Sequence, residues 1–383
     1  MRDVAHIPFV IADDLSGAAE IAGAALRHGW DPRLLRYTTT VPMIASDRAV
    51  VIDTDSRGMA PAAAAQKAHA AFASIAAHGG EPFKKIDSLL RGPVLAEIEA
   101  ALEALRRDTV LLLSQNPSRG RCVVDGRYLV DGVPLHETSF RDDPEYPRFS
   151  ADVRELLGPS TRPVVVLRPG DSIRTGAINV ACASTLDQVR GWSRVIAPNV
   201  LPVGGFDLFS AILSRPALLR PAANTIEAGG PRLILSGSAS AYARGLPALA
   251  AAINVPAFTV PASVFASSDA VDNSWHDPIV TAIQDRSICV VTVGYSRVAG
   301  AGVGARLQRV LADCAADVFA RTHARLFVDG GATASAVIER LGWRDLDVRA
   351  ELAPGVVELH APPVNGIITI KPGSYAWPEQ VWI

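Results

Sequence analysis

The sequence has few cysteines and no excess of charge of either sign. Its four cysteines are scattered through 383 residues without a CxxC pair, which argues against a disulfide framework or a zinc site and predicts reduced thiols. The formal net charge at pH 7 is −2, so we do not expect the basic face of a nucleic-acid-binding protein. We therefore expect a cytoplasmic protein without a nucleic-acid partner.

Long hydrophobic runs and the common phosphate-binding motif are also lacking. No run of about 18 apolar residues occurs, so no membrane span is expected. The segment MRDVAHIPFV carries charge and a proline where a signal peptide needs an unbroken apolar stretch. No GxxxxGK(S/T) sequence occurs, which excludes a P-loop. A homo-oligomer is left open, because the sequence contains neither a coiled-coil repeat nor an identifiable apolar patch.

What the sequence does contain is an alternation of short β-branched runs with alanine-rich stretches of helical pattern. Most of the β-branched runs are continuously apolar, which is typical of strands covered on both faces in a parallel sheet. The candidate strands are Ile7–Ala12, Ala49–Thr54, Thr109–Ser114, Pro163–Leu167, Leu233–Ser236, Ile288–Val293, Leu326–Val328 and Gly366–Ile370. Because 383 residues exceed one ordinary core, we predict two α/β domains with mostly parallel sheets and an active-site cleft between them.

Two segments interrupt this alternation. Arg215–Pro231 is rich in proline, glycine and alanine and ends just before a new strand, which predicts an N-terminal domain at 1–228 and a second domain at 229–383. Ser118–Pro147 is rich in glycine, aspartate and proline. We interpret it as a hairpin plus loop that could lie over a site.

Polar residues follow the first two strands of the N-terminal half. Asp13 and Asp14 come directly after the first strand, where α/β sheets bind ligands, and such carboxylates could bind a polyol hydroxyl and accept its proton. The alternative is that Asp14 or Ser16 only caps the next helix. Arg57 follows the second strand, and its guanidinium could clamp a substrate carboxylate with two hydrogen bonds. The alternative is an ordinary surface arginine.

The segment Lys84–Pro93 combines cations, a hydroxyl, a carboxylate and a helix start, which indicates an anion pocket. Its candidate site residues are Lys85, Asp87, Ser88 and Arg91. The alternative is a solvated charged turn. Further along, Arg121 and His136 could complete a polar substrate pocket, although a lone histidine is more often structural.

The C-terminal half contains glycine turns that suit a nucleotide. Leu235–Ser240 and Phe327–Ser335 each join a strand to a helix through small and hydroxyl-bearing residues, which allows backbone N–H groups to approach a phosphate. A third approach is expected at Lys371–Tyr375. In contrast, Gly300–Ala305 is close to the dinucleotide fingerprint GxGxx(G/A). It supports an alternative in which the chain is an NAD-dependent oxidoreductase.

Taken together, these motifs resemble the four-carbon acid sugar kinase family. The resemblance is carried by IADDLSGAAE, DTDSRG, KKIDSLLRG, NPSRGRCVVDGRYLVDGVPLHET and FRDDPEYP, and later by LILSGSASAYAR, FVDGGATASAVIERLG, ELAPGVVEL and IITIKPGSY. It implies a sugar-acid-binding domain followed by a nucleotide-binding domain, and transfer of phosphate from ATP, with Mg²⁺, to the C4 hydroxyl of threonate, erythronate or oxo-tetronate.

Site residues carried over by this resemblance fall on the motifs already described. The sugar-acid contacts would be Asp13, Asp14, Arg57 and the turn from Lys85 to Arg91, with Asp13, Asp14 and Asp87 as the catalytic candidates. The resemblance implies ATP contacts at Ser238, Gly330, Gly331, Ala332, Thr333 and Gly373.

Two positions depart from the family pattern. Ala332 stands where relatives have an acidic residue, and Lys371-Pro372-Gly373-Ser374-Tyr375-Ala376 replaces the usual Lys-Ser-Gly-Asn-Phe-Gly. Asp329, just before the glycine pair, could take over a metal or ribose contact, or it could cap the turn. The departure at Ala332 keeps a second alternative in view, a non-catalytic sugar-acid sensor.

Overall fold

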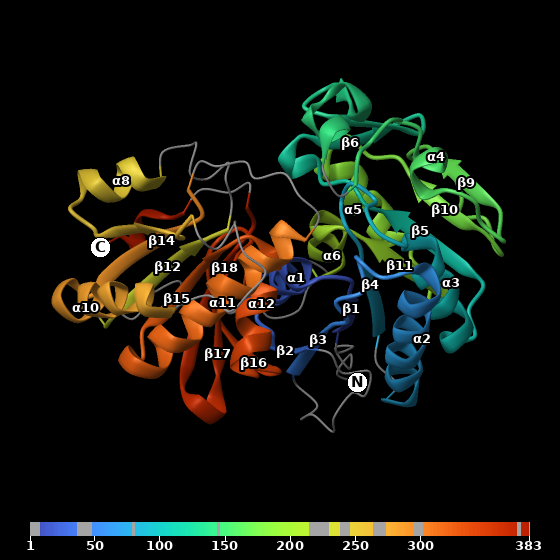
Figure 1. The fold of residues 1–383 in the computed structure, drawn as a ribbon. Helices are drawn as coiled ribbons and strands as arrows, with labels where there is room; N and C mark the ends of the chain where they lie inside the picture. The colour runs from blue at the N-terminus through green and yellow to red at the C-terminus, as the bar shows by residue number, and fades with distance from the viewer. Residues whose placement is uncertain are drawn as a thin grey trace. The chain divides into compact units, whose positions relative to one another are not determined.

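A computed structural model describes residues 8–36, 48–78, 81–143, 146–213, 230–237, 246–262, 273–294, 302–373 and 377–382. The chain falls into two compact units, Met1–Pro221 and Ala222–Ile383, and each contains both strands and helices (Figure 1). The predicted boundary after residue 228 lies outside the described residues. The cleft that we predict between the domains stays a prediction.

Unit 1 is built on a parallel sheet. Its strands lie in the order β2-β3-β1-β4-β11-β5-β10-β9, and each adjacent pair runs in parallel. Their bounds are β1 Pro8–Ala12, β2 Asp31–Arg36, β3 Arg48–Asp53, β4 Glu81–Lys85, β5 Thr109–Leu113, β9 Val164–Leu167, β10 Ile178–Ala181 and β11 Val200–Gly204. Strands such as β5 (TVLLL) are buried along their whole length, which is why they read as continuous apolar runs.

Helices cover this sheet on both faces. They are α1 Leu15–Arg27, α2 Pro61–His78, α3 Val94–Leu105, α4 Val153–Leu157, α5 Leu186–Arg194 and α6 Phe206–Leu213. Helix α1 packs against α6, whereas α2 lies beside α3 (Figure 1). Under α2 and α3 the core includes Ile11, Ile52, Phe72, Ile98 and Leu112, all fully buried. The apolar stripes of these helices therefore fix the strand ends on which the site depends.

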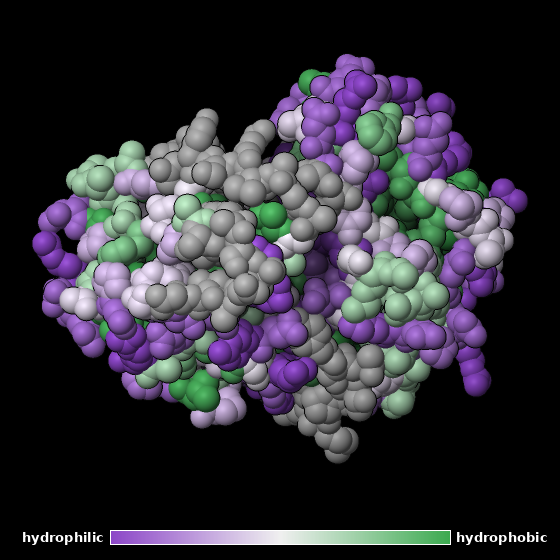
Figure 2. Space-filling model, viewed as in Figure 1, coloured by the Kyte–Doolittle hydropathy of each residue, from purple (hydrophilic) through white to green (hydrophobic). Residues whose placement is uncertain are grey.

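A small antiparallel sheet forms a hairpin module in unit 1. It consists of β6 Arg121–Val124, β7 Arg127–Val130 and β8 Val133–Pro134. The two turns are Asp125-Gly126 and Asp131-Gly132, and all four residues have positive φ, as two-residue hairpin turns with an Asp-Gly sequence require. The hairpin predicted within Ser118–Pro147 is confirmed. Figure 2 shows that the outer surface of this module is largely hydrophilic.

The strands of unit 2 lie in the order β13-β14-β12-β15-β18-β17-β16, with both parallel and antiparallel pairs. The pairs from β13 to β18 are parallel, and β17 pairs antiparallel with both neighbours. The strands are β12 Arg232–Ser236, β13 Ala257–Thr259, β14 Ile288–Thr292, β15 Arg325–Asp329, β16 Asp345–Ala353, β17 Val356–Ala361 and β18 Gly366–Lys371. The helices are α8 Leu246–Ala252, α10 Asp277–Arg286, α11 Val303–Thr322 and α12 Gly331–Leu341.

The fold class is confirmed, because both units are α/β and most strand pairs are parallel. Each predicted strand coincides with an observed strand to within one or two residues at its ends. In the part of the chain that the structure describes, no helix has the length and hydrophobicity that a membrane crossing requires.

Candidate active site

The polar motifs of the N-terminal half meet at one edge of the unit 1 sheet. Strand β1 lies between β3 and β4, so the residues that follow these three strands are neighbours at their carboxyl ends. Asp13 and Asp14 follow β1, Arg57 follows β3, and the turn from Ile86 to Arg91 follows β4. This edge is the ligand-binding edge of parallel α/β sheets.

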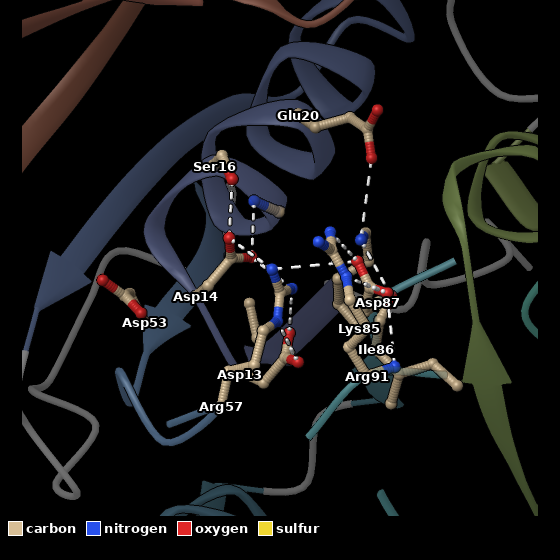
Figure 3. Close-up of polar contacts among 12 residues, drawn as sticks. Asp13, Asp14, Ser16, Glu20, Asp53, Arg57, Lys85, Ile86, Asp87 and Arg91 are labelled. Atoms are coloured by element: carbon tan, nitrogen blue, oxygen red, sulfur yellow. Dashed lines mark hydrogen bonds and ion pairs between the residues drawn. The ribbon is translucent and has the colours of Figure 1, made fainter. Parts of the chain in front are cut away.

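Arg57 is the centre of the cluster (Figure 3). Its Nε and Nη2 donate to the two carboxylate oxygens of Asp13, at 2.9 and 3.0 Å. Its Nη1 and Nη2 donate to those of Asp14, at 2.8 and 2.7 Å. Burial alone would lower the pKa of the Arg57 guanidinium, but Asp13 and Asp14 raise it well above its ordinary value. Arg57 is thus a permanent cation that holds two carboxylates side by side.

Asp14 caps helix α1 and is the most accessible carboxylate of the cluster. Its Oδ1 accepts from the Gly17 amide at 2.9 Å and its Oδ2 from the Ser16 hydroxyl at 2.6 Å. The side chain is 17% exposed, compared with 2% for Asp13 and 7% for Asp87. Burial would raise the pKa of Asp14, but Arg57 and the helix cap lower it below its ordinary value. Asp14 therefore does cap the helix, as the alternative expects, and this contact is compatible with a functional role, which stays a prediction.

The turn after β4 holds the third carboxylate. Arg91 Nε and Nη2 each donate to Asp87 at 2.9 Å, and the Leu89 amide donates to the same carboxylate at 3.0 Å. Burial would raise the pKa of Asp87, but Arg57 and Arg91 hold it far below its usual range. Gly92 follows with a φ of 87°, and a Cβ there would lie 3.0 Å from Arg57 Cγ. Glycine at this position therefore lets the turn pack directly against Arg57.

The two lysines of β4 point to opposite faces of the sheet, as strand alternation requires. Lys85 lies in the cluster, donates to the Ile86 carbonyl at 2.9 Å and pairs with Glu20 at 3.6 Å. Lys84 is fully buried on the other face and pairs with Glu97 of α3 at 3.1 Å. Of the two lysines in the predicted anion pocket, only Lys85 lies on the face of the sheet that carries the cluster.

The predicted covering segment does contact the cluster. The Tyr146 hydroxyl donates to the Arg57 carbonyl at 2.9 Å, and Asp143 accepts from Arg91 Nη1 at 3.4 Å. Arg121, at the start of β6, donates to the Ser88 hydroxyl. Ser88 and Arg121 are therefore brought together, as the sequence predicts for residues of one pocket. Whether they bind substrate stays a prediction.

Two further acidic residues differ in their relation to the Arg57 cluster. Asp53, at the end of β3, is set away from the cluster (Figure 3) and forms a buried pair with Arg36 at 2.7 Å. The sequence motifs do not point to Glu20 of α1, which lies against Lys85 and also binds Arg119. The available signal was a single acidic residue in the alanine-rich stretch AAEIAGAAL.

Helix α1 offers a test of how closely the cluster is packed. A Cβ at Gly17 would lie 2.6 Å from Asp14 Oδ1 and 3.1 Å from Lys85 Nζ, so Gly17→Ala must displace one or both groups. Because alanine is a better helix former than glycine, we expect the thermal midpoint to hold while kcat falls by about tenfold, the effect of a misplaced carboxylate. Gly191→Ala in α5, where a Cβ meets no atom within 4 Å, is the matched control. Unchanged kcat in Gly17→Ala would contradict the packing argument.

In unit 2, the predicted nucleotide turn lies between β15 and α12. Gly330 has a φ of 97°, and a Cβ there would meet no atom within 4 Å, so the backbone before α12 borders open space. The first amides of α12, from Gly331 to Thr333, begin an eleven-residue helix and suit a phosphate. A Cβ at Gly373 would lie 3.9 Å from Asp329 Oδ1, which places the third glycine turn beside this one. Ser238 lies outside the described residues.

Asp329 is buried beneath this turn. Its carboxylate accepts from Lys371 Nζ at 2.7 Å and from the Ser236 hydroxyl at 3.2 Å, and both ionic side chains are almost fully buried. These bonds tie the ends of β12, β15 and β18 together. They favour a structural role for Asp329 over contact with a metal or ribose.

The dinucleotide-like segment Gly300–Ala305 is only partly covered by the described residues. Gly300 and Ala301 lie outside the described residues, and α11 begins at Val303. Within the ranges that the structure describes, no group of three or more His, Cys, Asp or Glu side chains is placed to hold a metal ion. A metal that accompanies nucleotide phosphates does not need such a protein cage.

Comparisons with known proteins agree with this division of the chain. Residues 9–216 match the family model described as a sugar-binding N-terminal domain, and residues 233–375 match the nucleotide-binding C-terminal domain. A 3-oxo-tetronate kinase of Cupriavidus necator is 26% identical over 98% of this chain and 96% of its own length. A D-threonate kinase of the same organism is 29% identical over 97% and 96%.

The fold is also found among solved structures. A Salmonella typhimurium LT2 protein superposes with a TM-score of 0.82 at 18% sequence identity, covering 98% of this chain and 97% of its own. The paired domain matches and the nearly full-length relatives extend the agreement from the site motifs to the whole sequence. The chain therefore belongs to the four-carbon acid sugar kinase family and is a phosphotransferase.

Proposed function

We propose that this enzyme transfers the γ-phosphate of ATP to the C4 hydroxyl of a four-carbon sugar acid, which could be threonate, erythronate or oxo-tetronate. The observation that carries the proposal is the Arg57 cluster, in which three carboxylates from two adjacent strand ends are held by two arginines. Carboxylates held in this way can accept hydrogen bonds from a polyol and orient one hydroxyl for attack. Two near-full-length relatives are named kinases of such acids.

Asp14 is the carboxylate best placed to orient the attacking hydroxyl. It is the most exposed of the three, and Arg57 and the helix cap fix its position. Its lowered pKa keeps it ionised at neutral pH, which suits hydrogen-bond acceptance from the acceptor hydroxyl. Asp13 and Asp87 are more deeply buried and each is held by an arginine. In this mechanism they keep Arg57 and Arg91 in position.

Arg57, Lys85 and Arg91 are proposed to contact the substrate's hydroxyl groups. Four donor contacts of Arg57 already go to Asp13 and Asp14, so its predicted role as a clamp for the substrate carboxylate would require an exchange of partners. Its contribution within the observed geometry is positioning of Asp14.

The turn Gly330–Thr333 and Gly373 are proposed to hold ATP, together with Ser238. ATP with Mg²⁺ supplies the transferred phosphoryl group and neutralises its charge. Gly330 leaves the backbone open to a phosphate, and Thr333 is buried at the start of α12. Cytoplasmic localisation and a homo-oligomeric state stay predictions.

A branched side chain in this turn should weaken nucleotide binding without affecting sugar-acid binding. Gly331→Val would fill the space that we assign to a phosphate, so we expect the KM for ATP to rise at least about tenfold while sugar-acid binding is kept. Titration of each ligand by calorimetry separates the two effects. Equal ATP affinity in Gly331→Val and wild type would remove the turn from the nucleotide site.

Turnover distinguishes the proposed function from its alternatives. An ADP-release assay over D- and L-threonate, D-erythronate and 3-oxo-tetronate, run beside an NAD-reduction assay on the same acids, is the direct test. ADP release with one acid supports the kinase. NAD reduction would support the oxidoreductase alternative. Acid binding without either activity would support the sensor alternative.

A further inference from the structure

Arg121 differs from most of the cations around the Arg57 cluster. Arg57, Lys85, Arg91 and Arg119 each lie within ion-pair distance of a carboxylate. Arg121 has no such partner among the described residues. Its guanidinium donates to the Ser88 hydroxyl and lies 5.8 Å from the centre of the Phe140 ring. It is only partly exposed, so its charge is poorly compensated.

A second polar group close to Arg121 is unsatisfied. Tyr128 of β7 is fully buried, and its hydroxyl has no hydrogen-bond partner within the described ranges. Burial raises the pKa of the Tyr128 phenol. The charge of Asp87 raises this pKa further, whereas the charge of Arg121 lowers it. Tyr128 pairs with Val123, which lies two residues after Arg121 on the adjacent strand, so the side chains of Tyr128 and Arg121 lie on the same face of the hairpin. A buried polar atom without a partner costs about 1–3 kcal/mol, and such atoms in native proteins call for an explanation.

Two more unsatisfied nitrogens lie in the same part of unit 1. Arg148 Nε and His136 Nδ1 are buried and accept or donate no hydrogen bond in the described part of the chain. Burial lowers the pKa of Arg148, and Asp87, Arg91 and Asp143 are its charged neighbours. These residues lie in the segment that matches a sugar-binding domain. Buried polar atoms without partners are expected there if an anionic ligand completes their hydrogen bonding.

We propose that Arg121 and the Tyr128 hydroxyl bind the carboxylate of the substrate, and that the hairpin module carries this acid-recognition site. The proposal rests on the proposed function, because it assigns one end of the same substrate. A carboxylate placed at Arg57 or Arg91 would lie against Asp13, Asp14 or Asp87 and be repelled. At Arg121 it would meet an uncompensated guanidinium, which can bind it through two parallel hydrogen bonds.

Binding of an acid and of its neutral analogue tests the assignment. The probes are D-threonate, D-erythronate and threitol, which lacks the carboxylate, titrated into the full chain without ATP. We expect Arg121→Gln to weaken binding of the preferred acid about 10- to 100-fold, as loss of a charge-assisted hydrogen bond does, and to leave threitol binding unchanged. Arg127→Gln, an exposed arginine on the same hairpin, is the matched control and should bind as wild type does.

Tyr128→Phe provides a variant that does not depend on charge. Because the hydroxyl has no partner in the free protein, its removal should leave the thermal midpoint unchanged or higher while acid binding weakens about fivefold or more. Equal acid affinity in Arg121→Gln and wild type, with ADP release by wild type intact, would overturn this proposal alone. Wild type that neither binds an acid nor releases ADP would overturn it together with the proposed function.

Discussion

Asp14→Asn is expected to lower kcat by about 10²–10⁴, the usual contribution of a group that orients or deprotonates a nucleophile. The fold should survive, because asparagine caps a helix about as well as aspartate and can accept the Gly17 amide hydrogen bond. The charge that orients the acceptor hydroxyl is lost, while Asp13 still holds Arg57 through two hydrogen bonds. Steady-state kinetics and a thermal melt of the same preparation measure both quantities.

Asp55→Asn is the matched control for this substitution. Asp55 lies two residues before Arg57, its side chain is 41% exposed, and its φ of 48° is one that asparagine adopts readily. It removes the same charge from the same edge of the sheet without touching the cluster. A kcat of Asp14→Asn that stays within a factor of about three of the control would contradict the role proposed for Asp14.

Lys84→Met is expected to reduce the free energy of unfolding by about 3–5 kcal/mol, because it leaves a buried carboxylate without its cation. The side chains of Lys84 and Glu97 are 0% and 2% exposed, and Lys84 Nζ lies 3.1 Å from Glu97 Oε2. Glu97 also accepts from the Ser56 hydroxyl, and Ser56 lies next to Arg57. Urea unfolding at pH 7 measures the loss.

The double variant Lys84→Met with Glu97→Leu distinguishes the effect of an unpaired buried carboxylate from the effect of altered packing. Because a buried ion pair replaced by apolar residues is often neutral in stability, we expect the double variant to recover most of the loss. If the double variant is as unstable as Lys84→Met, packing volume and not the unpaired carboxylate sets the stability.

Some strands were easier to predict from the sequence than others, and buried charges explain part of the difference. Apolar strands such as β1 and β5 are evident in the sequence because burial on both faces favours apolar residues. Strands β2 and β4 were not among the predicted strands, because each carries charged residues. Arg36 and Lys84 are buried only because Asp53 and Glu97 neutralise them. Such partners lie far along the chain, and a local pattern cannot reveal them.

The candidate site was located from the sequence, but its internal pairing was not. Strand ends gather at one edge whatever their side chains, so Asp13, Asp14, Arg57 and Asp87 could be placed together. The sequence could not show that Arg57 is already bound by two carboxylates. Strand alternation would have placed Lys84 on the far face from Lys85, had β4 been assigned as a strand.

The pairing of the site's cations with carboxylates also determines what the site attracts from a distance. Because Arg57, Arg91, Lys85 and Arg119 are each neutralised locally, their fields largely cancel beyond a Debye length of about 8 Å. Electrostatic steering of anions into the cluster is therefore weak. Chloride and inorganic phosphate, which are abundant in cells, gain little by entering. A ligand gains by matching the geometry of fixed acceptors and donors, so selection acts at contact and not during approach.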